Sequence, residues 1–365
     1  MFSTRQSNER RRSMELNLSI VANLTITQLK QTTLQGRTDA KVHVQIETLT
    51  RKDARNGKPF WEILAADAEA KFTLRAWSDT PSFAVCEGLQ QGMFLEISGE
   101  FSNDTNFGLD ARNWTCRELS AEERTSLLAG SPELRAKQAA DYEYIQMETT
   151  AVSDPRLKAL CALFLSEFGD RLKRTAAARH NHHARRGGLV EHLAQMMRSA
   201  VAVCTAYAHL NRDLLVAGVL FHDSGKLWEN TLPPDGFSMP FDERGEMLGH
   251  ITIGIELVNT LWRKLTSMSE AKNWNGLSPA SDDVRLHLLH LLASHHGELQ
   301  FGSPIVPKTP EAWALHYVDN LDAKMEMMAS AYQGKTLAPR IFERFWPLPG
   351  NALLPLAKFV DPGTV

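Results

Sequence analysis

A His-Asp doublet, His222-Asp223, directly follows the apolar run from Leu214 to Phe221. Adjacent residues on a helix point about 100° apart, so an imidazole and a neighbouring carboxylate can bracket one cation. An ionisable pair beside a buried run needs a partner, because burying a bare charge is costly. The doublet therefore indicates a site for a metal ion.

Further candidate ligands surround the doublet, since twelve of the thirteen histidines fall between positions 180 and 316. A lone histidine on an apolar helix face is usually a hydrogen-bonded core residue. Here, however, His and Asp residues recur on one predicted helix after another, and core packing alone does not explain such a series. The candidate ligands are His192, His222, Asp223, His250, His295, His296 and Asp319.

A ligand set of imidazoles and carboxylates that contains no thiolate suits Mn²⁺, Fe²⁺, Zn²⁺ or Mg²⁺. The candidates outnumber the needs of one ion, so we expect two divalent ions bridged by Asp223, with Mn²⁺ as first choice. Such a pair suits phosphodiester hydrolysis, because one ion activates a water and the other stabilises the leaving oxygen.

Two kinds of periodicity divide the 365 residues. Apolar residues alternate with polar ones around 42–46, 72–76 and 93–97, which predicts five or so short strands and a small closed barrel. Helical spacing begins after Ser153-Asp-Pro155 and predicts helices near 155–168, 188–208, 212–226, 247–266, 282–295 and 310–330. The expected order is therefore a β domain followed by an all-α domain.

The predicted boundaries are a disordered basic tail (1–16), a barrel (17–119), a linker with some helix (120–154), a helical domain (155–335) and a C-terminal return segment (336–365). Cys86, Cys116, Cys161 and Cys204 are far apart and form no C-x-x-C, so a reducing cytoplasm is expected. The N-terminus has no secretory pattern, no apolar run is long enough to span a bilayer, and no membrane partner is expected. The net charge of −3 identifies no partner.

Substrate-binding candidates come from local patches of cations and one aromatic residue. Lys71, Arg75 and Trp77 share the predicted outer face of one β-strand. A single-stranded nucleic acid is bound by such a face, because the cations contact its phosphates and the flat ring stacks on a base. The loop 51–58 adds Arg51, Lys52, Arg55 and Lys58, and a basic run before His192 ends in Arg185 and Arg186. A solvated loop and a solvated helix end are the alternative readings of these two patches, and Trp77 could instead close the barrel.

The order H…HD…H…HH…D resembles the HD-domain superfamily of metal-dependent phosphohydrolases. Several strings more narrowly resemble the YhaM family of 3′→5′ exoribonucleases, which carry an OB-fold ahead of an HD domain. These strings are HHARRGGLVEH (182–192), HDSGKL (222–227), LGHI (248–251), SHHGELQFGSP (294–304) and LHYVDNLDAK (315–324). The resemblance covers about residues 35–330.

The resemblance implies a first ion on His192, His222, Asp223 and Asp319, and a second ion on Asp223, His250 and His295. The role of His296 stays open between ligation and orientation. Lys226 stands where related enzymes place a lysine that contacts phosphate, and a solvated lysine is the alternative. Gly188 occupies the position of a Glu that some cyclic-dinucleotide enzymes use, and the Gly-Tyr-Pro signature is absent; both argue against that activity. Arg185-Arg186 replace an expected aromatic residue.

The sequence thus predicts an OB-fold followed by a helical HD domain, in a metal-dependent 3′→5′ exonuclease of single-stranded RNA. Single-stranded DNA is an alternative substrate, Asp223 and Lys226 are the expected catalytic residues, and a homo-oligomer is left open. Two other functions remain: a small-molecule nucleotide phosphohydrolase with a regulatory barrel, and a nucleic-acid-binding protein without catalysis. The two enzyme functions differ in whether oligonucleotides are cleaved.

Overall fold

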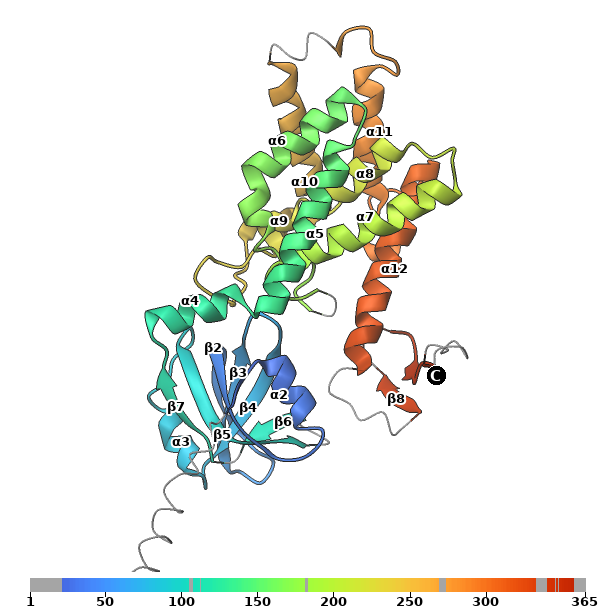
Figure 1. The fold of residues 1–365 in the computed structure, drawn as a ribbon. Coiled ribbons are helices and arrows are strands. Elements are labelled where there is room, and N and C mark those ends of the chain that lie inside the picture. Colours follow the sequence, from blue (N-terminus) through green and yellow to red (C-terminus); the bar gives the residue numbers. More distant parts are fainter. Residues whose placement is uncertain are drawn as a thin grey trace, which may run out of the picture. The chain divides into compact units, whose positions relative to one another are not determined.

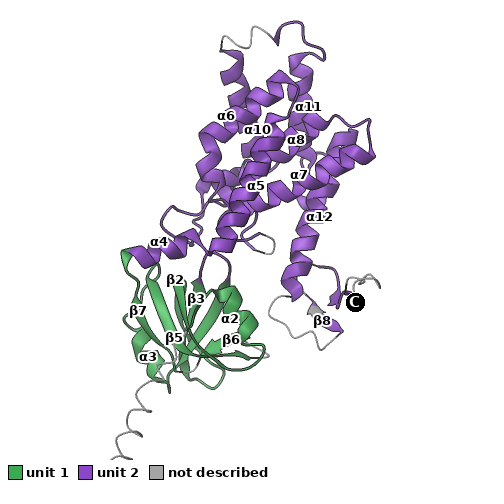
Figure 2. Ribbon diagram, in the orientation of Figure 1, with its two compact units in different colours: residues 1–65, 71–121 green, residues 66–70, 122–365 purple. Residues whose placement is uncertain are grey.

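The computed structural model describes residues 22–104, 108–111, 113–180, 183–268, 274–332, 340–344, 346 and 348–357. The predicted basic tail lies outside this part of the chain. The chain divides into two compact units, 1–65 with 71–121, and 66–70 with 122–365 (Figure 2). Each unit is described by itself.

The first unit is built on one curled, mainly antiparallel sheet (Figure 1). Its core path runs β4-β3-β2-β5-β6, with β1 parallel to β2 and β7 antiparallel to β5. The end strands β4 and β6 pack against each other, so the sheet curls around one interior. The strands are β1 (Ala22–Leu24), β2 (Thr38–Asp53), β3 (Pro59–Ala66), β4 (Lys71–Trp77), β5 (Phe94–Asp104), β6 (Gly108–Ala111) and β7 (Thr115–Glu118), and the helices are α2 (Ile26–Thr32) and α3 (Pro81–Cys86).

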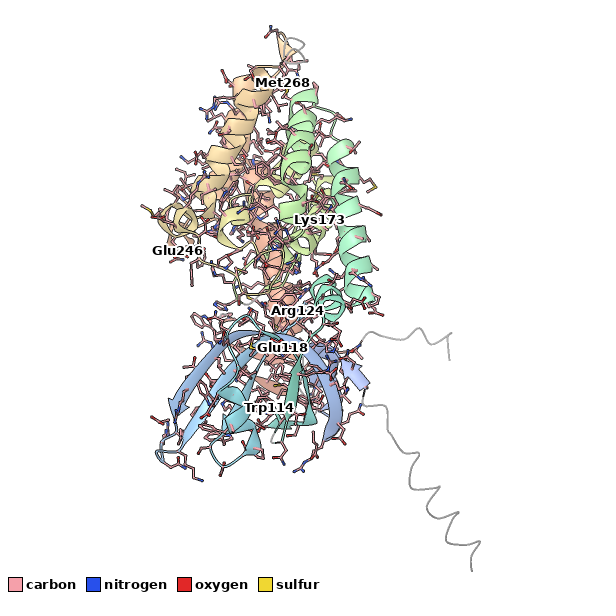
Figure 3. All side chains as sticks on the ribbon, turned by 90° about the vertical axis from the view of Figure 1, so that its left-hand side faces the viewer. Trp114, Glu118, Arg124, Lys173, Glu246 and Met268 are labelled. Atoms are coloured by element: carbon pink, nitrogen blue, oxygen red, sulfur yellow. The ribbon has the colours of Figure 1, made fainter. Side chains whose placement is uncertain are left out.

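The apolar residues of the predicted alternating segments form the core of this sheet. Val42, Val44 and Ile46 are fully buried on β2, and the burial pattern of β4 alternates along its whole length. The strand predicted around 93–97 needs one correction. Met93 lies in the turn before β5, and only Leu95 and Ile97 are buried within the strand. Trp114, labelled in Figure 3, is also buried and lies against Gly99, where a Cβ would come within 3.2 Å of it.

The second unit is a helical bundle, and the described helices cover all six predicted ones. Their starts carry caps that satisfy the free N–H groups of the first turn, such as Ser131, Asp154, Asn211 and Asp242. The helices are α4 (Ala121–Ala129), α5 (Pro132–Thr150), α6 (Pro155–Leu172), α7 (Gly188–Ala206), α8 (Arg212–Phe221), α9 (Lys226–Glu229), α10 (Glu243–Thr266), α11 (Ser281–Ser294) and α12 (Pro310–Tyr332), with the 3₁₀ turn η2 (Leu299–Phe301).

Two boundaries differ from the sequence expectation. The helix predicted over 212–226 ends at Phe221, and the doublet lies in the turn between α8 and α9. Much of the predicted linker is helix, and α5 packs against α7 and contributes Ile145 to the core of the bundle. At the other end, the hairpin β8 (Ile341–Arg344) and β9 (Asn351–Leu353) packs on the last turns of α12.

None of the helices in the described part of the chain combines the length and apolar content needed to cross a membrane.

Candidate metal centre

Five helices of the bundle bring the predicted ligands to one place. His192 lies on α7, His222 and Asp223 follow α8, and His250 lies on α10. His295 and His296 follow α11, and Asp319 lies on α12. His192, His222, Asp223 and His295 are at most 2% exposed, so the cluster is built into the core of the unit.

Two glycines allow the His-Asp turn to meet α10. A Cβ on Gly225 would lie 1.9 Å from the carbonyl oxygen of His250, so only glycine lets the two segments touch. Gly249 has φ of 69° inside α10, in the left-handed region that glycine adopts without strain. The resulting kink aims His250 at Asp223, with 3.6 Å between Nε2 and Oδ1.

The two carboxylate oxygens of Asp223 face different histidines. Oδ2 lies 3.3 Å from Nε2 of His222 and 3.7 Å from Nε2 of His192. Oδ1 lies 3.6 Å from Nε2 of His250 and 3.8 Å from Nε2 of His295. Asp319 completes the first side, with Oδ1 at 3.3 Å from Nε2 of His192 and 4.0 Å from Nε2 of His222.

We name these two sides the first ligand group (His192, His222, Asp223 Oδ2, Asp319) and the second ligand group (Asp223 Oδ1, His250, His295, His296). Ligands bound at about 2.0–2.2 Å to one ion lie about 3–4 Å from each other. The four distances between imidazole nitrogens and carboxylate oxygens of the first group, 3.3–4.0 Å, fall in this range, which favours one ion there.

Each of the five imidazoles is oriented through its Nδ1. His222, His295 and His296 make this contact with the carbonyl oxygens of Val219, Leu292 and Phe301, at 2.7–2.8 Å. His192 and His250 make it with carboxylates, Asp322 at 2.6 Å and Glu229 at 3.2 Å. When Nδ1 donates, Nε2 carries the lone pair, so all five rings can present a ligand atom to the centre.

The polar atoms at the centre fit a divalent cation. Nε2 of His222, His250 and His295 and Oδ1 of Asp223 are buried without a hydrogen-bond partner. Buried polar atoms normally have a partner, and such a cluster of acceptors is what a cation satisfies. His192, His222 and Asp223 can hold one ion together, as can His250, His295 and His296.

The charges of the cluster also suit metal ligation. Burial raises the pKa of Asp223, but Lys226 and His222 outweigh it, so the pKa lies well below the usual range. Burial and the neighbouring His222 hold the pKa of His295 well below its usual value, so this ring is neutral. Burial lowers the pKa of His192, but Asp319 and Asp322 raise it to about 9, so binding of a cation at Nε2 would displace a proton from this ring.

Residues that sequence reasoning missed hold the ligands in place. Oδ2 of Asp322 contacts both His192 and Nε2 of His183, the latter at 3.0 Å. Glu229 accepts the backbone N–H of His250 at 2.8 Å and also contacts its ring. Asp322 could have been found, because it lies three residues after Asp319 on the same helix face. No local pattern marks Glu229, which lies 21 residues from His250.

Lys226 lies at the edge of the centre. Its Nζ donates to Oδ2 of Asp223 at 2.6 Å, and its side chain is 12% exposed. The lysine therefore reaches the carboxylate that both ligand groups share.

The basic run before His192 makes contacts within the protein. Arg185 is paired with Glu191 at 2.6 Å and with Glu326 at 3.2 Å. Arg186 donates to the carbonyl oxygens of Pro233, Pro234 and Gly236, and Arg179 to those of Glu229, Met239 and Pro240. These contacts favour a structural role for Arg185 and Arg186 over phosphate binding. Arg185 joins α7 to α12, whereas Arg186 and Arg179 hold the segment after the doublet.

In the first unit, Lys58, Arg75 and Trp77 line one cavity of about 570 Å³, together with Asp79, Asp104 and Asp110. The other predicted substrate residues are not gathered there. Acids contact most of these cations, in the pairs Lys52–Glu62, Arg75–Glu62, Lys58–Asp79 and Lys71–Glu47. Arg51 lies over the ring of Phe83, Trp77 is stacked on Phe60, and Arg55 is exposed.

Comparison with known proteins gives two findings. The family described as HD domain matches residues 189–324. Among solved structures, the chain is similar to one in "Structure of RecG bound to three-way DNA junction", with a TM-score of 0.23 and 11% sequence identity. That match covers 51% of this chain and 26% of the other, and a TM-score of this size carries no conclusion.

The matched residues begin before His192 and end after Asp319, so they include every candidate ligand. The helical part of this chain therefore carries an HD domain, and this domain indicates a metal-dependent phosphohydrolase.

Proposed function

We propose that the protein is a metal-dependent exonuclease that hydrolyses single-stranded RNA from its 3′ end. The observation that carries the hydrolytic part is the position of Asp223, whose two oxygens each face a separate group of histidines. Two divalent ions, Mn²⁺ in the first instance, would supply a nucleophilic water at neutral pH and stabilise the leaving oxygen. The choice of RNA and of direction rests on the resemblance to the YhaM exoribonucleases.

The residues of the chain have distinct tasks in this proposal. Asp223 belongs to both ligand groups, so one of its oxygens would be offered to each ion. Lys226, beside it, contacts a non-bridging oxygen of the scissile phosphate, because an ammonium group at the edge of the centre is a natural phosphate donor. Asp322 and Glu229 orient His192 and His250.

In this proposal the first unit, over about 17–119, is an OB-type barrel that holds the strand, and the HD domain lies within 155–335. The cavity lined by Lys58, Arg75 and Trp77 offers two cations for phosphates and one indole ring for a base. Stacking on an aromatic side chain contributes about 1–3 kcal/mol per base.

A second candidate function is hydrolysis of a small nucleotide, with the first unit serving regulation. The observation that favours it is the pairing of Lys52, Lys58 and Lys71 with Glu62, Asp79 and Glu47. Three aspartates also line the cavity beside Lys58 and Arg75. Cations neutralised by neighbours attract phosphates less strongly, so this surface is a weaker nucleic-acid groove than its composition predicts.

One assay separates the two candidates. A 5′-labelled single-stranded RNA, its DNA counterpart and a panel of nucleoside mono-, di- and triphosphates are incubated with Mn²⁺, Mg²⁺ or EDTA, with Asp223→Ala as the inactive control. The exonuclease proposal expects a ladder of stepwise-shortened 5′-labelled RNA in Mn²⁺ and none in EDTA. Turnover of a nucleotide with intact RNA would overturn it in favour of the second candidate.

A further inference from the structure

The outer face of α12 has a composition that is unusual for the surface of a globular protein. Trp313, Tyr317, Leu321 and Met325 are 43–61% exposed and follow one another at intervals of four residues. At about 100° per residue, they lie on the side of the helix opposite Asp319. We name these four residues the α12 stripe.

Charged side chains are absent from the exposed positions of this helix. Between Pro310 and Ala329, all of which the structure describes, every residue classed as exposed is uncharged. The acids of α12 are used elsewhere: Glu311 and Asp322 are buried, Asp319 belongs to the metal centre, and Glu326 is paired with Arg185. A surface helix normally presents charged and polar residues on its outer face, so the α12 stripe requires a partner.

The composition also identifies the class of partner. A nucleic acid needs cations for its phosphates, and an interfacial membrane helix carries Lys or Arg beside its apolar face. Lys324 is the one basic residue of α12, and it is half-buried. The cations beside Leu321 and Met325 in the neighbouring hollow, Lys137, Arg185 and Arg198, are each paired with an acid. Aromatic residues and Met, with charged residues depleted, are typical of the apolar core of protein interfaces, and homodimer interfaces are the more apolar ones.

The pattern of the α12 stripe matches itself under two-fold symmetry. An isologous contact requires that each residue meet its counterpart from the second copy in reverse order. Reversal about position 319 places Tyr317 against Leu321 and Trp313 against Met325, so each aromatic ring meets an aliphatic or thioether side chain. Ridges of residues four apart interdigitate when two helices cross at about −50°, the commonest class of helix packing.

The exposed apolar area is sufficient for such a contact. A large side chain presents about 150–250 Å² when free, so the exposed fractions of the α12 stripe amount to about 400 Å². The hairpin that covers the next turns of α12 adds the outward cross-strand pair Ile341 and Leu353, at 62% and 60% exposure, or about 250 Å² more. A standard interface buries about 800 Å² per partner, a little over half of it apolar.

We propose that two copies of this chain associate through the α12 stripe, with Tyr317 and Leu321 at the two-fold axis and the hairpin at the edge. The HD ligands lie on the other side of α12, so the contact leaves the metal centre of each copy in place.

Sedimentation velocity of the full chain tests this proposal. At micromolar concentration the wild type should sediment as a species with twice the mass of one 40.9 kDa chain. Tyr317→Glu/Leu321→Glu should raise the dissociation constant at least about 100-fold, because two carboxylates would be buried in an apolar contact. Leu286→Glu is the matched control, since Leu286 is 63% exposed on α11 and should leave the dimer intact.

Cross-linking gives a second test that needs no variant. Lys324 lies five residues from the proposed axis, so the two copies of this lysine come within about 20 Å, given a rise of about 1.5 Å per residue and about 10 Å between helices. A cross-link between Lys324 and Lys324 can form only between copies, and the proposal expects it. A wild-type chain that stays monomeric, or a double variant that dimerises like the wild type, would overturn the proposal.

Discussion

Asp322 offers a test of how the protein prepares its metal centre. Its carboxylate accepts the hydrogen bond from Nδ1 of His192 at 2.6 Å and contacts His183 through the same oxygen. Asp322 is 6% exposed, so no water can readily replace it. We predict that Asp322→Ala lowers the affinity of the first ligand group for a divalent ion.

The magnitude follows from the hydrogen bond that is lost. Leaving a buried N–H without its charged acceptor costs about 1–3 kcal/mol, and every 1.4 kcal/mol is tenfold in affinity. Outer-shell carboxylates of metal-bound histidines are in fact worth about 10–100-fold. Asp322→Asn should recover part of this loss, because its amide oxygen can occupy the place of Oδ2 and still accept from His192.

Isothermal titration of the metal-free protein with Mn²⁺ or Zn²⁺ measures the affinity, and the unfolding temperature in EDTA checks that the fold is retained. Asp282→Ala is the control, since Asp282 is an almost fully exposed acid on α11. The reasoning is refuted if Asp322→Ala binds the metal as the wild type does, or if Asp322→Asn is no better than the alanine variant.

Three further predictions concern the surroundings of the centre and the first unit. Burial raises the pKa of Glu191, but Arg185, Gln138 and Lys137 outweigh this effect and lower the pKa to about 2. The ionised carboxylate therefore stabilises the fold above pH 4.5, and this stabilisation is lost as the pH falls toward 2. About 3 kcal/mol of unfolding free energy should disappear over that window, and an equally steep acid loss in Glu191→Gln would count against the assignment. Lys226→Ala should retain metal but lower kcat/KM about 10–100-fold, as expected for one charged hydrogen bond to phosphate, and unchanged kinetics would remove Lys226 from the mechanism. Replacing Arg51, Lys52, Arg55 and Lys58 by Ala should flatten the salt dependence of single-strand binding by about 0.7 per lost contact, whereas an unchanged slope would mean that this loop does not touch the backbone.

The sequence predicted the order of the elements because periodicity is a local property. The alternation on β4 and the helical spacing of α6 to α12 each lie within a single segment, and each reappears in the structure. The end of α8 at Phe221 could not be read in this way, since no glycine or proline marks it. The position of His250 depends instead on Gly225 packing against the kink inside α10, a contact between residues 25 positions apart.

The candidate ligands could be listed from residue type, but the carboxylates that orient them were not, and one of them carries no local pattern. Helical spacing from Asp319 could have marked Asp322, but Glu229 is an ordinary acid in the sequence, and only folding brings it to the ring of His250. For Arg185 and Arg186 the sequence predicted a role that the structure does not favour. Their spacing predicted a positive entrance to the site, whereas Glu191, Glu326 and the carbonyl oxygens of 233–236 satisfy them within the bundle. Charge in the sequence does not show which charges are already paired.

The central claim is that Asp223 joins two ions in a hydrolytic centre, and metal content measured together with phosphodiester turnover tests it most directly. Purified wild-type protein loaded with Mn²⁺ should hold two ions per chain and hydrolyse a chromogenic phosphodiester. Asp223→Ala should bind less metal and lose turnover, because both ligand groups share this carboxylate. An Asp223→Ala variant with full metal content and wild-type turnover would contradict the account.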